Sequence, residues 1–567
     1  MARWMWLVVL ALVAACSDTS APACGQWQQI GGAADHTGTT CVTGQMLDST
    51  LATVTFDPFV ALEEADSTGD LTIHYQTPLL DGGDVYMLTK SGTYTRCERF
   101  PGTSIPDCYE QDEVTRLDSQ IWNETAYEWK RDGSLAARWT FATDWKPLAF
   151  VGFEPVFQPV IAGEHVAIPG AEGSIWIVDR ESGDVVAHVQ PFGVDTGATV
   201  AGGLTYANGT IYYDAWQLDT DATHGWLVAV DSANRATTVD FATLVPDAPA
   251  QTDLCYDDYT YNFTGIPPLP WPPLNPDGSV VMPPQNPCGP QLPGLNAAPA
   301  VGPDGTIFTV SAAAGSPYYS YIVAVAPDLT PKWDTSLRGL LADGCGVLVP
   351  RDDTVCSGRA QLGIDPYTGM MPAGQVSYAS SASPVALPDG GVLYGSFTGY
   401  NSSRGHLIEL DPRGFFVASY DFGWDITPAV APDGTIAIKD NHYNEDAQGH
   451  DLGPYFIAKL DRHLQPMWWF QSANTQSCTR EPDGTVQCVS DHPDGFEWCI
   501  NAPAIDAAGT IYVNSEDGTL YAIDPNGDEQ ASYFLDQALG AAYTPVALDH
   551  EGRVFALNSG VMTVIGQ

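Results

Sequence analysis

The chain has 567 residues, of which 69 are acidic and 22 are basic, so its formal net charge is −47. This balance disfavours a nucleic-acid partner, because binding a phosphate backbone requires clustered lysine and arginine. The aromatic content of 11% suits packed β-sheets better than a helical protein. We interpret the acidity as favouring solubility in a salty habitat or attracting cations.

Residues 1–15 are predicted to be a targeting segment. Arg3 supplies a positive charge, and residues 6–14 are almost entirely apolar but too few to span a bilayer as a helix. The segment ends Leu-Val-Ala-Ala before Cys16, which resembles the bacterial lipobox, where lipoprotein signal peptidase cleaves before an acylated cysteine. The resemblance implies lipid attachment at Cys16, and Ser17 favours an outer-membrane lipoprotein. The alternative is an ordinary secretory signal with a chance cysteine.

The cysteines beyond Cys16 fall mostly in close pairs. In an exported protein such pairs predict loop-closing disulfides rather than metal ligands. The predicted pairs are Cys24 with Cys41, Cys97 with Cys108, Cys255 with Cys288, Cys345 with Cys356 and Cys478 with Cys488. Cys499 is the odd one, so the pairing among Cys478, Cys488 and Cys499 stays open.

A short sequence motif recurs along the rest of the chain. A proline with small and β-branched residues is followed by a tight turn and Gly-Thr-Ile, and it returns at residues 299–307, 428–436 and 503–511. A unit of short strands repeating every 40 or so residues indicates the blades of a β-propeller. The repeat outweighs the length of the chain, which alone suggests three or four domains.

Each unit is expected to hold four strands. An inner strand begins at proline, a Pro-Asp-Gly turn follows, and the third strand is a near-continuous apolar run such as 520–524, typical of strands packed on both faces. The fourth strand often carries a tryptophan seven or eight residues after an aspartate. Trp139, Trp333 and Trp469, with Trp468 as the alternative to Trp469, are predicted to dock on the neighbouring blade.

These repeats resemble those of pyrroloquinoline quinone (PQQ)-like propellers. The shared features are Ala522-x-Asp524 with Gly527, and Val178-Asp179 with Gly183, each followed in the family by a docking tryptophan. The resemblance covers about residue 77 to the C-terminus and implies an all-β propeller of eight four-stranded blades, with seven possible. Residues 46–567 would form the propeller, and residues 16–45 a lipid-anchored tether that adds a strand near Trp27 to the last blade.

Two stretches do not fit a blade. Residues 245–295 are rich in proline and aromatic residues and are closed by Cys255 and Cys288, while residues 473–499 hold three cysteines. Long insertions on rigid scaffolds are frequent binding elements. A disulfide-tied surface loop without a partner is an equally weighted interpretation.

Chemical motifs are sparse. Dehydrogenases of this superfamily stack PQQ on a disulfide between adjacent cysteines and hold calcium, whereas this chain has no Cys-Cys dipeptide and no stretch that matches those calcium ligands. An acidic loop at residues 440–446 offers oxygen ligands for calcium, although a solvated loop is the favoured interpretation. We predict no catalytic residue and assign no cofactor-binding or metal-binding residue.

The sequence therefore favours a lipid-anchored, non-catalytic binding or assembly scaffold of the cell envelope. Its partners would be the membrane, through the lipid, and envelope proteins, a small molecule or a glycan. One alternative is a PQQ-dependent dehydrogenase of an alcohol or sugar, with PQQ and calcium as cofactors. Another is an extracellular carbohydrate- or polymer-binding protein.

Overall fold

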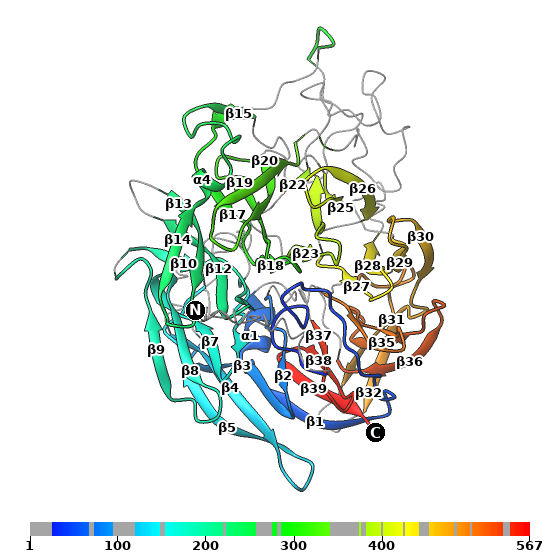
Figure 1. The fold of residues 1–567 in the computed structure, drawn as a ribbon. Helices are drawn as coiled ribbons and strands as arrows, with labels where there is room; N and C mark the ends of the chain where they lie inside the picture. The colour runs from blue at the N-terminus through cyan, green and yellow to red at the C-terminus, as the bar shows by residue number, and fades with distance from the viewer. Residues whose placement is uncertain are drawn as a thin grey trace, which may run out of the picture.

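The protein is an eight-bladed β-propeller. Eight antiparallel sheets stand in a ring, and the first strand of each sheet faces the middle while the fourth lies at the rim (Figure 1). This confirms the predicted all-β fold and the count of eight blades. The computed structural model describes residues 25–66, 73–94, 119–147, 154–194, 196–218, 223–256, 275–279, 285–338, 340, 374–375, 382–398, 401–422, 426–441, 453–480, 485–498, 502–536 and 545–567.

The first four blades follow one another along the chain. Blade 1 comprises β2 (Leu79–Asp81), β3 (Asp84–Gly92), β4 (Gln120–Trp129) and β5 (Leu135–Ala142). Blade 2 comprises β6 (Val160–Ala162), β7 (His165–Pro169), β8 (Ile175–Asp179) and β9 (Val185–Val189). Blade 3 comprises β10 (Ala198–Val200), β11 (Thr205–Ala207), β12 (Thr210–Leu218), β13 (Thr223–Val230) and β14 (Ala236–Asp240). Blade 4 comprises β17 (Gln291–Pro293), β18 (Ala300–Val301), β19 (Ile307–Ala313), β20 (Ser316–Val325) and β21 (Pro331–Ser336).

The other four blades complete the ring. Blade 5 comprises β22 (Gly374–Gln375), β23 (Val385–Ala386), β24 (Val392–Thr398), β25 (Asn401–Leu410) and β26 (Phe416–Phe422). Blade 6 comprises β27 (Ala429–Val430), β28 (Ile436–Asn441), β29 (Tyr455–Leu460) and β30 (Pro466–Phe470). Blade 7 comprises β33 (Ala504–Ile505), β34 (Ile511–Asn514), β35 (Thr519–Ile523) and β36 (Glu529–Phe534). Blade 8 comprises β37 (Val546–Leu548), β38 (Val554–Asn558), β39 (Val561–Gly566) and β1 (Ser49–Thr55).

The last blade joins the two ends of the folded chain. Strand β1 pairs antiparallel with β39, with Thr53 opposite Thr563, and so supplies the fourth strand of blade 8. An N-terminal strand does complete the ring, but it is not the one near Trp27 that the sequence predicted. Trp27 instead bridges Leu80 in the inner strand of blade 1. The stretch Ser49–Thr55 is rich in β-branched residues, which favour a strand.

Tryptophans of the fourth strands join successive blades. Each indole Nε1 donates to a backbone carbonyl in the next blade: Trp139 to Arg180 at 2.9 Å, Trp333 to Pro412 at 3.0 Å and Trp468 to Pro525 at 3.0 Å. The docking role is confirmed for Trp139 and Trp333. Trp469 does not dock on blade 7; it is 49% exposed, because neighbouring residues on a strand point to opposite faces. Trp468 holds the docking position.

The core lies between the blades. The second and third strands are buried along much of their length, and all seven residues of β19 are buried. Because each sheet covers the apolar faces of its two neighbours, every blade contributes to one continuous ring of packing. Two short helices, α1 (Val60–Asp66) and α4 (Phe241–Leu244), are additions to this scheme.

Candidate functional site on the insertion face

The two ends of the ring differ in what they carry. At one end lie the turns after each inner strand, such as residues 303–305, and the turns between third and fourth strands, such as 411–414; we call it the short-turn face. The connections from the fourth strand to the next blade leave at the other end, the insertion face. In the described part of the chain, this face carries two extra hairpins, β15–β16 and β31–β32.

The N-terminal segment, residues 26–47, is bound to the inner side of the ring at the short-turn face. It runs in the middle of the ring in dark blue (Figure 1) and hydrogen-bonds to every blade in turn. The bonded pairs are Trp27 with Leu80, Gln28 with Ile161, Gln29 with Tyr206, Ala34 with Val301, Asp35 with Ala386, Thr37 with Val430, Gly38 with Ile505 and Gln45 with Gly552. Most of these bonds are backbone to backbone, so the segment continues the inner strands of the blades.

Within this segment, His36 contacts two blades of the ring. Its Nδ1 lies 3.0 Å from the carbonyl oxygen of Pro384 in blade 5, and its Nε2 lies 3.1 Å from the hydroxyl of Thr205 in blade 3. The ring is fully buried, and burial lowers its pKa from 6.5 to about 4. A neutral imidazole therefore fixes the segment at neutral pH.

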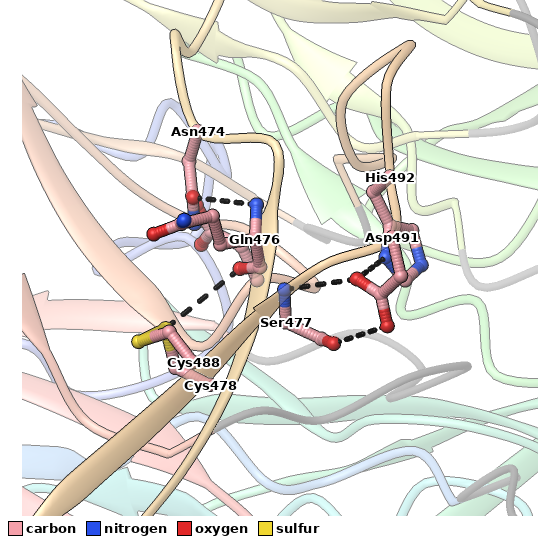
Figure 2. Close-up of a disulfide and its surroundings, with 8 residues drawn as sticks. Asn474, Gln476, Ser477, Cys478, Cys488, Asp491 and His492 are labelled. Carbon is pink, nitrogen blue, oxygen red and sulfur yellow. Dashed lines mark hydrogen bonds and ion pairs between the residues drawn. A yellow bond between two sulfur atoms is a disulfide. The ribbon is translucent and has the colours of Figure 1, made fainter.

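Hairpin β31–β32 is one of the two extra hairpins of the insertion face. Strand β31 (Gln476–Arg480) pairs antiparallel with β32 (Val486–Ser490), and the Cys478–Cys488 disulfide joins directly opposed residues (Figure 2). Every residue of β32 is exposed, Val489 to 63%. An isolated two-stranded hairpin is marginally stable, so the disulfide holds this exposed ribbon in shape.

The base of this hairpin is fixed to the propeller. The hydroxyl of Ser477 donates to Asp491 at 2.5 Å, and the same carboxylate lies 2.7 Å from His492 Nδ1 (Figure 2). Asn474 Nδ2 donates to the buried Asp517 of blade 7 at 3.0 Å. The guanidinium of Arg480 lies over the ring of Phe534, at the end of β36. A rigid base with an exposed ribbon suits a binding element.

The second hairpin is anchored differently. Strand β15 (Leu254–Tyr256) pairs with β16 (Gln285–Pro287), and the Cys255–Cys288 disulfide at its base is fully buried. Both predicted pairs, Cys255–Cys288 and Cys478–Cys488, are thereby confirmed. The C-terminal part of the predicted insertion, strand β17, belongs to the sheet of blade 4.

A buried ion cluster holds Asp57 and helix α1 against blade 1. Lys90 Nζ on β3 lies 2.8 Å from Asp57, 3.2 Å from Glu63 on α1 and 2.7 Å from Glu154. The indole Nε1 of Trp122 donates to Glu154 at 3.0 Å. Burial raises the pKa of Glu63 to about 8, although the ammonium of Lys90 opposes this shift. One cation thus serves three carboxyl groups, which is a structural arrangement.

A single carboxyl group is buried between blades 3 and 4. Asp214 on β12 is fully buried and accepts a 2.5 Å hydrogen bond from the hydroxyl of Thr309 on β19. Burial raises its pKa from 3.8 to about 8, so the group is protonated at neutral pH.

Several predicted residues lie outside the described part of the chain. They include Cys16, Cys24, Cys97, Cys108, Cys345, Cys356 and Cys499, and residues 442–446 of the acidic loop. Cys41 is described and is disulfide-bonded. Asp440, at the start of the acidic loop, is buried and accepts hydrogen bonds from Tyr420 and Trp469. Its carboxylate is therefore engaged in joining β26, β28 and β30.

The described residues do not fit the cofactor set of a quinoprotein. Within the described ranges no three His, Cys, Asp or Glu side chains are grouped so as to hold a metal ion. The sequence has no pair of adjacent cysteines on which a quinone would stack. We derive no reaction step through PQQ or calcium.

Among the described helices, none is long and apolar enough to cross a membrane.

Comparison with known proteins supports the fold. The quinohemoprotein alcohol dehydrogenase of Comamonas testosteroni is similar over 96% of this chain and 77% of that chain, with 12% identity and a TM-score of 0.51. The chain shares its propeller fold with this enzyme. At this identity the likeness establishes the fold alone. No protein-family model matches the chain, and none of the curated proteins does.

Two further solved structures are similar at lower scores. A europium-containing methanol dehydrogenase has a TM-score of 0.47 and 13% identity, over 94% of this chain and 89% of that chain. BamB from Moraxella catarrhalis has a TM-score of 0.40 and 11% identity, over 87% of this chain and 96% of that chain.

The residues that sequence reasoning missed are those of the N-terminal segment. The sequence predicted a tether with one strand over residues 16–45, whereas residues 26–47 contact all eight blades. No periodic signal marks this stretch, because its contacts are made mainly by the backbone. The five glycines from Gly25 to Gly44 are the one hint of close backbone approach.

Proposed function

We propose that this protein is a lipid-anchored scaffold of the cell envelope that binds its partner through the insertion face. The observation that carries the proposal is the path of the N-terminal segment. This segment is bound on the short-turn face from blade 1 to blade 8, so a lipid on Cys16 would hold that face toward the membrane. The hairpins of the insertion face would then point away from the membrane.

The length of the tether limits how far the propeller can stand from the bilayer. Gly25, the first described residue, lies directly against the backbone of His550 in blade 8. Residues 17–24 alone separate it from Cys16, and a fully extended stretch of that length spans about 30 Å. The short-turn face would therefore stay close to the membrane surface, and partners in the envelope would approach from the insertion face.

The partner that best suits the insertion face is a protein of the envelope. Hairpin β31–β32 has a rigid base, an exposed ribbon and unpaired edges among the described strands, and extended segments of other proteins can pair with such edges. A glycan or other polymer bound at the insertion face is the alternative ligand.

A PQQ-dependent dehydrogenase is the second candidate. It is favoured by the similarity in fold to the alcohol dehydrogenase of Comamonas testosteroni. Fold alone does not establish an activity, since one scaffold hosts many functions. The cofactors in that case would be PQQ and calcium, and the substrate an alcohol or a sugar.

Two measurements test the proposal. Mass spectrometry of the protein purified from envelopes should find a diacylglyceryl group on Cys16, and Cys16→Ala should abolish it; an unmodified Cys16 would overturn the anchor. Purified protein supplied with PQQ and calcium should give no reduction of an artificial electron-accepting dye with alcohols or aldoses. Turnover of the dye would instead establish the dehydrogenase.

A further inference from the structure

An apolar patch lies at the outer edge of blades 5 and 6. The patch comprises Phe415, Phe416 and Val417 at the start of β26 and Met467 and Trp469 on β30, which are 63%, 42%, 49%, 54% and 49% exposed. The two strands are joined where the indole Nε1 of Trp469 donates to the hydroxyl of Tyr420 at 3.1 Å. We call these five residues the rim patch.

The rim patch is unusual for an outer strand. Three consecutive exposed apolar residues serve a function in most natural proteins, because they otherwise promote aggregation. The other outer strands with exposed aromatic or aliphatic residues do not reach this density: β9 exposes Val185 and Val186, at 52% and 48%. Proteins that keep such a surface use it to contact a partner or a lipid.

The kinds of side chain in the rim patch and its position favour a lipid surface. Arg413, whose side chain is 76% exposed, lies over the ring of Phe415 at 5.0 Å, and the exposed Arg462 lies in the matching turn of blade 6. The guanidinium of Arg413 is ion-paired with Asp411 at 2.7 Å, so this turn adds little to the negative charge of the chain. Aromatic, aliphatic and arginine side chains together are typical of interfacial membrane contacts.

The rim patch also lies on the correct side of the molecule. Phe415 and Arg413 belong to the turn between the third and fourth strands of blade 5, which is part of the short-turn face. The N-terminal segment is bound on the same face. We propose that the rim patch inserts into the surface of a bilayer and so fixes the orientation of the propeller on the membrane. This inference extends the proposed function, because the anchor would bring the patch to the lipid.

Vesicle binding without the lipid anchor tests the inference. The chain from Ser17 onward, exported behind a cleavable signal peptide, should co-sediment with vesicles of three parts phosphatidylethanolamine to one part phosphatidylglycerol. The triple variant Phe415→Ser, Phe416→Ser, Met467→Ser should bind the vesicles at least about tenfold more weakly than the unchanged chain. The matched control Val185→Ser, Val186→Ser, on the outer strand of blade 2, should bind like the unchanged chain.

Three results would overturn the inference. The first is no vesicle binding by the unchanged chain, and the second is equal binding by the triple variant. The third is self-association of the unchanged chain in sedimentation velocity that the triple variant loses, which would assign the rim patch to a second copy. None of these results depends on Cys16, so mass spectrometry of the anchor fails or succeeds separately.

Discussion

The indole of Trp468 rests on Gly527 of the next blade. A Cβ built on that glycine would lie 2.8 Å from the indole ring, closer than real Cβ atoms approach a neighbour, and the glycine has a φ of +92°. The same relationship joins Trp139 to Gly183 and Trp333 to Gly414. Tryptophan–glycine contacts therefore join three pairs of neighbouring blades.

Replacing Gly527 should loosen blade 7 from blade 6. The variant Gly527→Ala is expected to lose about 2–3 kcal/mol of stability, because it combines a clash with the indole and a left-handed backbone. The matched control is Gly133→Ala, whose φ of +84° is similar but whose Cβ would meet nothing within 4 Å. Urea unfolding should show the larger loss for Gly527→Ala. Equal losses would mean that the indole contact contributes nothing.

The variant Asp214→Asn should be more stable than the unchanged protein, and this difference should grow as the pH rises. Its pKa is 3.8 when unfolded and about 8 when folded, so the folded state must keep a proton that the unfolded chain releases above pH 4. The stability this group contributes is complete below pH 4 and is lost as the pH rises through 8. Asp214→Asn removes the free-energy cost of keeping this carboxyl group protonated in the folded state, which is roughly 4 kcal/mol at pH 7.

Urea unfolding at two pH values checks this expectation. Asp214→Asn should be more stable than the unchanged protein at pH 8 and should differ little from it at pH 4. The amide oxygen can still accept the hydrogen bond from Thr309. A variant that is no more stable than the unchanged protein at pH 8 would contradict the burial of a protonated Asp214.

Removing the cation of the buried ion cluster should be strongly destabilising. Lys90→Met leaves Asp57, Glu63 and Glu154 without their ammonium, and breaking a buried pair typically costs about 3–5 kcal/mol. Lys130→Met, at a lysine whose side chain is 44% exposed, should have little effect on the melting temperature. A loss for Lys90→Met no larger than that for Lys130→Met would contradict this account of the cluster.

The two described disulfides should have different effects when removed. Replacing Cys478 and Cys488 by serine should increase hydrogen exchange in residues 476–490 while the melting temperature of the propeller changes little, since this hairpin stands outside the blades. Replacing the buried pair Cys255 and Cys288 should lower the melting temperature, because two polar hydroxyls then enter an apolar site beside Ala313. The opposite pattern would contradict the assignment of the hairpin as a separate element.

Much of the ring could be predicted from the sequence because its blades repeat. The Pro-Asp-Gly turns fix the backbone locally, as in Gly305 with a φ of +82°, and the apolar third strands are largely buried, as expected. The choice between Trp468 and Trp469 could also be made. Trp468 is seven residues after Asp461, as Trp139 is after Asp132, and in both blades the docking tryptophan lies beside a β-bulge.

The N-terminal segment could not be predicted in this way. Its bonds to the blades come mainly from backbone groups, which every residue has, so no residue pattern records them. The closing strand β1 likewise acquires its place from its partner β39, at the other end of the chain. Long-range pairing of this kind is decided by the folded ring rather than by local sequence.

The central claim is that the insertion face binds the partner, and photo-crosslinking tests it most directly. A photoreactive benzoylphenylalanine at Val489 on hairpin β31–β32 should yield a discrete adduct in intact envelopes, and the same label at Val185 on the outer strand of blade 2 should not. Protease would remove a protein adduct, and glycosidase a glycan adduct. The account predicts a specific adduct at Val489 alone. No adduct at Val489, or the same adducts at both positions, would contradict it.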